Sequence, residues 1–530
     1  MTAVTLTART ARFRPARALR LEIKHSPVVW ALPVLAAIFY FNAYRTAAGF
    51  PPIWTVRASV ITGANLVFFS VVGAGIAAWA AAREGRRKTG DLLATTARAP
   101  WARQSTVLAA TTFWVLLAYL VGVAVIYIQT ASQATWGGPP LWPVAVGVVG
   151  VAAACAIGFT VGTRFPGRFT APIVAVAVFV AWFVGVAAAN GVQNAGNGMK
   201  GTSALLVAAI GRPQNPALGV FYRVAPDVSI AQVMFMGGVL LVAVGLLALL
   251  PGGRAPGVRG LSFGSSFASA ARRPTVVAAV LVACGVAASA TAFSLTGTAR
   301  NFFPTGWEIP ALHDAVGDQP IRYAPDCAGG AFTVCIHPAF EPYLGAMSAA
   351  LQPAAAEIAG VPGAPVRAQM NSGVAPQAVA GTTSVFTYST EQEGFGDESF
   401  WASPATARTA AWEQGVQQDF ITWFVSDPGQ DWSGPTPAEE AVAIALLARI
   451  GAPVPQYPQF SGPSTSSGAS STVGTVGGSG AAGAQSGATA AQITAAASRF
   501  GLLSSAARHA WLAANIAGLR SGAITLAQLP

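Results

Sequence analysis

Seven apolar stretches, each close to the length that a helix needs to cross a bilayer, constrain this chain more than any other feature. They run roughly over residues 28–44, 60–82, 106–128, 141–161, 171–189, 233–250 and 276–295. About 20 mostly apolar residues in a helix cross the hydrocarbon core. The first stretch is the weakest, because it is short and holds Pro33. The pattern predicts an α-helical polytopic membrane protein.

The composition favours the same class. Hydrophobic residues make up 53% of the 530 residues and charged residues only 10%, whereas soluble domains carry about 25% charged residues. The net charge of +11 does not indicate nucleic-acid binding, because the basic residues cluster beside the apolar stretches. No cleavable signal peptide is expected, since a long basic segment precedes the first stretch and no small-x-small cleavage site ends it.

Lys and Arg are concentrated on alternate sides of the expected spans. The richer segments hold Arg9, Arg12, Arg14, Arg17, Arg20 and Lys24 before the first span, Arg83, Arg86, Arg87, Lys88, Arg98 and Arg103 after the second, Arg164 and Arg168 after the fourth, and Arg254, Arg259, Arg272 and Arg273 after the sixth. Cytoplasmic loops carry this excess. We therefore expect a bacterial plasma-membrane protein with a cytoplasmic N-terminus. With seven spans the chain after about residue 298 is extracytoplasmic, and one span fewer would reverse that side.

The four cysteines fall into two pairs. Cys155 and Cys284 lie within expected spans, whereas Cys327 and Cys335 lie in the tail in "DCAGGAFTVCIHP". An exported domain can keep a disulfide, and the Gly-Gly between the two cysteines permits a tight turn. A disulfide between Cys327 and Cys335 is expected, with two buried free thiols as the alternative. No metal site is expected, because no second Cys or His pair has the spacing of zinc ligands.

A dense run of charge, "AAREGRRKTGDLLATTARAP" at residues 80–99, follows the second expected span. Ordinary positive-inside anchoring accounts for its arginines. Anchoring does not account for the acidic residues Glu84 and Asp91. It also does not account for the short amphipathic helix expected here, in which Leu92 and Leu93 would lie on one side. We call residues 80–99 the charged strip.

The charged strip resembles the loop after the second helix of ABC-2 type permeases, the membrane subunits of one class of ABC transporter. That loop reads approximately R-E-x-R-R-x-T-x-E-L-L-x-T-x-P. The matching positions here are Arg83, Glu84, Arg86, Arg87, Thr89, Asp91, Leu92, Leu93 and Thr95, with Asp91 where Glu is commoner. The resemblance covers residues 10–250 and implies a six-helix core, here followed by a seventh span. It further implies an interfacial helix before the first span and a short apolar segment at Thr202–Gly211.

The resemblance also implies a mechanical role. In that family the loop is a coupling helix that docks in a groove of a separate ATPase subunit. Mixed charges would set register and partner choice, and Leu92 and Leu93 would supply an apolar anchor. No G-x-x-x-x-G-K-[ST] phosphate loop occurs in this chain, so it is not expected to be an enzyme. It would hold no cofactor, ATP and Mg²⁺ would bind the partner, and a second permease copy or paralogue would complete a dimer.

The tail predicts an α-rich domain with some strand. Alternating Phe332, Val334 and Ile336 indicate a strand, and Pro338 opens a helix. Two further helices are expected, one from Ser403 with Trp412, Val416, Phe420 and Trp423 on one face, and one with Glu439 and Glu440 in its first turn and Gly451 at its end. A last helix, about 490–518, holds Arg499, Arg508 and Arg520, which make it a poor eighth span.

The expected organisation is therefore as follows: a cytoplasmic interfacial helix at 1–26, a six-span core at 27–250, a loop and seventh span at 251–297, an extracytoplasmic domain at 298–460, a Gly/Ser/Ala-rich linker at 461–490 and a C-terminal helix packing on that domain at 491–530. The expected function is that of an ABC transporter permease. The alternative is a membrane-anchored sensor or receptor whose external domain binds a ligand or envelope partner. A third hypothesis is an exported peptidase-like enzyme, which would need zinc near His337 and Glu341, four residues apart in the sequence.

Overall fold

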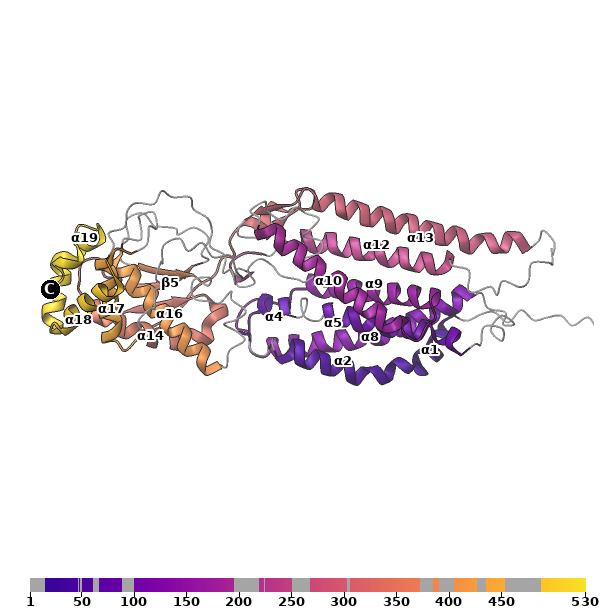
Figure 1. The fold of residues 1–530 in the computed structure, drawn as a ribbon, viewed down its shortest axis with the longest axis horizontal. Coiled ribbons are helices and arrows are strands. Elements are labelled where there is room, and N and C mark those ends of the chain that lie inside the picture. The colour runs from indigo at the N-terminus through magenta and orange to yellow at the C-terminus, as the bar shows by residue number, and fades with distance from the viewer. Residues whose placement is uncertain are drawn as a thin grey trace, which may run out of the picture. The chain divides into compact units, whose positions relative to one another are not determined.

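The structure is a computed structural model that describes residues 15–45, 47, 50–60, 66–87, 100–194, 219–223, 225–249, 267–302, 306–371, 385–389, 405–426, 435–452 and 488–530. The chain divides into two compact units (Figure 1), Met1–Arg322 and Tyr323–Pro530. We call them the membrane unit and the tail unit and describe each by itself.

The described residues of the membrane unit up to residue 296 are mostly helical. Its helices are α1 (Pro15–Lys24), η1 (Pro27–Ala31), α2 (Leu32–Phe39), η2 (Tyr40–Tyr44), α4 (Trp54–Val60), α5 (Leu66–Ala81), α6 (Arg83–Arg86), α8 (Pro100–Ala131), α9 (Trp142–Arg164), α10 (Thr170–Asn194), α12 (Asp227–Leu249) and α13 (Phe267–Thr296). Each expected span coincides with helix over its described residues. The first runs on through η1, α2 and η2 without a gap, and Ser26, which caps η1 before Pro27, separates it from α1.

Five segments within the described residues are long and apolar enough to cross a membrane. They are Ala16–Tyr44, Pro100–Ala131, Trp142–Arg164, Asp227–Leu249 and Thr275–Thr296. Two shorter apolar helices, Phe68–Ala81 and Thr170–Ala181, lie at the other two expected stretches. The helical class of the chain is therefore confirmed, and these five helices are consistent with a multi-pass membrane protein. The count of seven spans stays a prediction.

Small residues bring pairs of these helices into backbone contact. A Cβ built on Gly158 of α9 would lie 2.1 Å from the Ala74 carbonyl oxygen of α5, and one on Gly162 would lie 2.4 Å from that of Ala78. Gly238 of α12 and Gly285 of α13 approach each other in the same way, each Cβ meeting the other's carbonyl oxygen at 2.5 Å. Such close approach replaces hydrophobic driving force between helices in lipid. Figure 1 shows α12 and α13 lying along one another.

Apolar side chains are found both inside and outside the membrane unit. The interior is built around Phe69, Tyr119 and Phe159, each about 1% exposed. Outward-facing positions are also apolar, among them Ile173 and Phe183 of α10. Soluble proteins rarely expose such contiguous apolar surface, and a surface of this kind suits contact with hydrocarbon.

The segment after α13 belongs to the membrane unit. Strands β1 (Arg300–Phe302) and β2 (Gly306–Glu308) form an antiparallel hairpin, followed by η6 (Ala315–Asp318). Buried Ile309 then packs with Ala231 of α12. The expected external domain began at residue 298, but the compact tail unit begins only at Tyr323. Within the preceding segment, buried Ile309 and partly buried Leu312 pack with residues of α12 and the end of α13.

The tail unit contains a four-stranded sheet in the order β3-β4-β5-β6. β3 (Asp326–Ala328) pairs antiparallel with β4 (Thr333–Ile336), while β4, β5 (Arg367–Asn371) and β6 (Val385–Ser389) are parallel. Between β4 and β5 run η7 (Pro338–Tyr343) and α14 (Leu344–Ile358), so the expected strand and following helix form a β-α-β unit. The rings of Phe332 and Phe386 lie 5.4 and 5.0 Å from that of Phe420 on α16 (Ala405–Val425).

The C-terminal helices complete the tail unit. α17 (Pro437–Arg449) begins with a capping box of Thr436 and Glu439. The single helix expected at 490–518 is instead two, α18 (Ala490–Leu502) and α19 (Ser505–Arg520), followed by η8 (Leu526–Gln528). The division arises because Ser504 adopts an extended conformation and its hydroxyl accepts the Ala507 N–H, capping a new helix.

Candidate functional site

The charged strip is described over its first part only. Arg83, Glu84 and Arg86 lie in α6, a single turn that follows α5, and Arg87 comes directly after it. Of the other residues matched to the ABC-2 pattern, Thr89, Asp91, Leu92, Leu93 and Thr95 lie outside the described residues. The described part of the site consists of Arg83 to Arg87 and the side chains that contact them.

Glu84 joins the strip to α8. Its Oε1 accepts the Nε–H of Arg103 at 2.9 Å and its Oε2 accepts an N–H of the same guanidinium at 3.0 Å. Both side chains are more than two-thirds buried. A two-pronged pair of this geometry fixes orientation as well as distance, so it joins α6 directly to the first turn of α8.

Arg83 joins the strip to α1. Its guanidinium lies 3.4 Å from Glu22, near the end of α1. α1 in turn is held to α8, because the indole N–H of Trp114 donates to the Ile23 carbonyl at 3.0 Å. The strip, α1 and α8 thus form a connected set of contacts.

The third contact of the strip is with the turn between α9 and α10. A Cβ built on Gly85 would lie 2.4 Å from the Cβ of Pro166, so only glycine allows this approach. Arg86 turns back over the ring of Trp79, 5.3 Å from its centroid, and donates to the Trp79 carbonyl at 2.8 Å. Arg87 is exposed. The first three charged residues of the strip therefore contact this chain itself, and Arg87 presents its charge to solvent.

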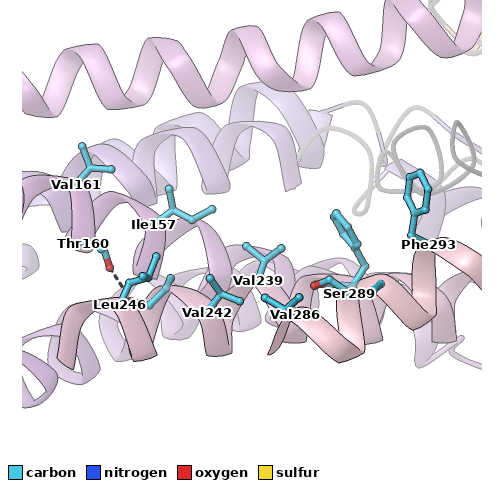
Figure 2. A pocket seen from close by; sticks show the side chains of 12 residues that line it. Ile157, Thr160, Val161, Val239, Val242, Leu246, Val286, Ser289 and Phe293 are labelled. Carbon is cyan, nitrogen blue, oxygen red and sulfur yellow. Dashed lines mark hydrogen bonds between the residues drawn. The ribbon is translucent and has the colours of Figure 1, made fainter. Parts of the chain in front are cut away.

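A groove of about 520 Å³ lies where α9, α12 and α13 meet (Figure 2). Apolar side chains line it, including Ile157, Val242 and Phe293. Its hydroxyl groups donate within the protein, Thr160 to the Ala243 carbonyl at 3.0 Å and Ser289 to the Phe235 carbonyl at 3.2 Å. A groove of this kind can hold a hydrocarbon chain and offers little to a polar ligand.

In the tail unit, Cys327 and Cys335 form the expected disulfide pair. They face each other directly across the antiparallel β3–β4 pair. His337 is fully buried, and its Nδ1 accepts the Ala339 N–H at 3.1 Å, which caps η7. Glu341 is exposed. The geometry gives His337 a structural part at the strand–helix turn, and within the described residues it belongs to no cluster of potential metal ligands.

Sequence reasoning missed one polar cluster, at the end of the membrane unit where α12 begins and α13 ends. His313 Nε2 lies 3.1 Å from Asp318 and 3.5 Å from Glu308, and its Nδ1 lies 3.4 Å from Asp227. The hydrogen bond to Asp318 raises the pKa of His313 above its ordinary value, Glu308 and Asp227 add to this, and burial opposes it. In the sequence, Glu308, His313 and Asp318 follow one another at intervals of five residues, and this spacing is the feature that could have indicated the cluster.

Comparison of the chain with models of known protein families, with curated proteins and with solved structures found no match.

Proposed function

We propose that this chain is the permease subunit of an ABC transporter in the bacterial plasma membrane. It moves a substrate across the bilayer using ATP hydrolysed on a separate ATPase subunit, and it pairs with a second permease copy or a paralogue. The N-terminus is cytoplasmic and the tail unit extracytoplasmic. The chain itself contributes no ATPase motif.

The observation that carries this proposal is the way the charged strip is fastened. Arg83 contacts α1, Glu84 contacts α8, and Gly85 contacts the α9–α10 turn. A loop that served only to hold the protein's orientation would need positive charge alone. Contacts from one short turn to two helices and to the turn that joins two others suit a loop that passes a displacement on to the bundle.

The exposed end of the strip supplies the other half of this role. Arg87 faces solvent, and Leu92 and Leu93 follow it in the sequence. An exposed cation selects and steers a partner, whereas apolar anchors supply affinity. We assign partner contact to residues 87–93 and transmission to Arg83, Glu84 and Gly85.

The proposal is tested by co-purifying the tagged full-length chain with an ATPase that carries a phosphate-loop motif and is encoded next to it. Arg87→Glu should weaken this association at least tenfold. Arg168→Glu is the matched control, because Arg168 is an exposed arginine of the α9–α10 turn outside the strip. Glu84→Gln should leave association intact and uncouple ATP turnover from substrate.

Two results would contradict the proposal. One is the absence of any ATPase associated with the intact protein. The other is equal loss of association in the Arg87 and Arg168 variants, which would indicate general charge attraction. Specific co-purification with a kinase or a sigma-factor regulator in place of an ATPase would support the sensor alternative.

A further inference from the structure

Four ionisable side chains meet where α12 begins and the chain leaves α13. Ligand atoms of Glu308, His313 and Asp318 all lie within 4.8 Å of one another. The carboxylate of Asp227, the first residue of α12, approaches the same imidazole from its other side, 3.4 Å from Nδ1. Three carboxylates thus surround a single histidine.

The local fold holds this cluster in place. The Ile309 N–H donates to Asp227 Oδ2 at 2.9 Å, which fixes the segment after β2 to the helix end. The side chain of Ile309 is fully buried and packs with Ala231 and partly buried Phe235 and Leu295. The His313 N–H donates to the Ile309 carbonyl at 2.9 Å, closing a tight turn. The backbone that carries His313 is therefore held at the start of α12.

The polar atoms of the cluster are not all satisfied by the protein. Asp227 is 0% exposed, and its Oδ1 has no hydrogen-bond partner within the described part of the chain. His313 Nδ1 and Asp318 Oδ1 are also buried and make no hydrogen bond within these residues, although Nδ1 lies 3.4 Å from the Asp227 carboxylate. Buried carboxylate oxygens without partners are costly unless a cation lies nearby. The helix N-terminus compensates the Asp227 charge only in part.

We propose that Glu308, His313 and Asp318 bind a divalent first-row transition-metal ion such as Zn²⁺, with Asp227 orienting the histidine. His313 Nε2 faces both ligand carboxylates, and its Nδ1 faces the buried carboxylate of Asp227. Metal-binding histidines commonly direct their second nitrogen at a carboxylate in this way, which sets the tautomer and ring orientation. An imidazole ligand favours Zn²⁺ over Mg²⁺ or Ca²⁺, which prefer oxygen ligands alone.

Bound metal would fasten residues 308–318 onto the start of α12. This is the segment through which the chain passes from the membrane unit toward Tyr323. Three protein ligands leave a fourth position of a tetrahedral ion for water or another donor. The proposal is independent of the transporter assignment, because it concerns only the stability and metal content of this segment.

The test uses full-length protein purified in detergent without chelators. Elemental analysis should find close to one Zn²⁺ per chain after equilibration with Zn²⁺ and removal of excess metal. His313→Asn should abolish this binding, and Asp227→Asn should weaken it by about 10–100-fold while leaving one site per chain. His509→Asn, which changes a histidine in α19 of the tail unit, is the matched control and should bind like the unaltered protein.

A second measurement keeps the proposal testable if a variant fails to fold. In the unaltered protein, Zn²⁺ should raise the apparent Tm and slow proteolysis between residues 303 and 323, and EDTA should reverse both effects. Absence of stoichiometric metal together with no Zn²⁺-dependent change in Tm would overturn the proposal. A response to Ca²⁺ but none to Zn²⁺ would equally overturn it.

Discussion

At the scale of single residues, glycines set how closely the membrane helices approach. Gly158 of α9 lies so near α5 that an added methyl group would overlap the Ala74 carbonyl, whereas a Cβ on Gly237 of α12 has its nearest neighbour among the described residues at 3.9 Å. The contact at Gly158 is with backbone, which cannot rotate away. The same substitution should therefore have opposite consequences at the two positions.

Gly158→Ala should destabilise the protein by about 1–3 kcal/mol, because overpacking forces the two helices apart. Gly237→Ala should be neutral or slightly stabilising, since Ala has the better helix propensity. The measurement is the apparent Tm of each variant in detergent, from the fraction that remains monodisperse after heating. Equal Tm values for the two variants would show that α5 and α9 are not packed backbone to backbone.

A second residue-scale feature concerns Asp419 of α16. Burial raises the pKa of its carboxyl from 3.8 to about 6. At pH values between 3.8 and about 6, the Asp419 carboxyl is therefore protonated in the folded protein and ionised in the unfolded chain. Stability from this group is fully present below about pH 4, is lost as the pH rises toward 6, and changes little above that.

Asp419→Asn should remove this dependence and stabilise α16 at pH 7 by roughly 1–3 kcal/mol. The measurement is hydrogen exchange of α16 amides in the full-length protein at pH 4.5 and pH 7, corrected for the intrinsic exchange rates. Glu341→Gln, at an exposed carboxylate, is the control and should keep the pH dependence. Unchanged exchange in the Asp419 variant would contradict the expected burial.

At the scale of elements, two arginines attach α19 to the rest of the tail unit. Arg508 is 1% exposed and pairs with Glu357 of α14. Arg520 donates its Nε–H to the Phe424 carbonyl at the end of α16, at 2.9 Å. The helix expected to pack on the tail domain does so through these cations as well as through buried Leu512.

Arg508→Ala should destabilise the tail unit by about 3–5 kcal/mol, because it leaves the mostly buried Glu357 without its cation. Arg499→Ala is the matched control, since Arg499 is exposed on α18, and it should change stability by less than about 0.5 kcal/mol. Limited proteolysis of the full-length protein measures both. Equal cleavage of the two variants at 488–530 would show that the pair does not hold α19.

At the scale of the whole molecule, the distribution of Lys and Arg predicts which side of the membrane each part occupies. A cysteine at Arg87 should react with an impermeant maleimide only from the cytoplasmic side, and a cysteine at Glu341 only from outside. Both positions are exposed. The background should carry Cys284→Ser, because Cys284 is exposed on α13. Labelling of position 87 from outside would reverse the orientation and remove the basis for the transporter proposal.

Local features of the sequence predicted most of the helices. Apolar length placed α8, α9, α12 and α13, because a chain in hydrocarbon must satisfy its backbone within each helix. Local chemistry likewise predicted α17, where Glu439 and Glu440 fall in the first turn. The break between α18 and α19 was missed, although Ser504 was a visible cap, because the apolar residues of 490–518 continue through it.

Pairings between segments that are distant in the chain could not be predicted from the sequence. Nothing local to Glu84 indicates that its partner is Arg103, or that Arg508 would meet Glu357, which lies 151 residues away in the chain. The parallel pairing of β5 and β6 was equally hidden, because short strands carry little periodic signal. The cluster around His313 joins a helix start to a loop 86 residues later.

Residue order alone was enough to predict a helical protein with segments apolar enough to cross a membrane, since apolar length and charge placement are local and additive. Which glycines touch, which charges pair and which carboxylates gather at His313 came from the three-dimensional packing. Those contacts depend on how closely segments far apart in the chain approach in three dimensions, and a linear sequence does not record their separation in space.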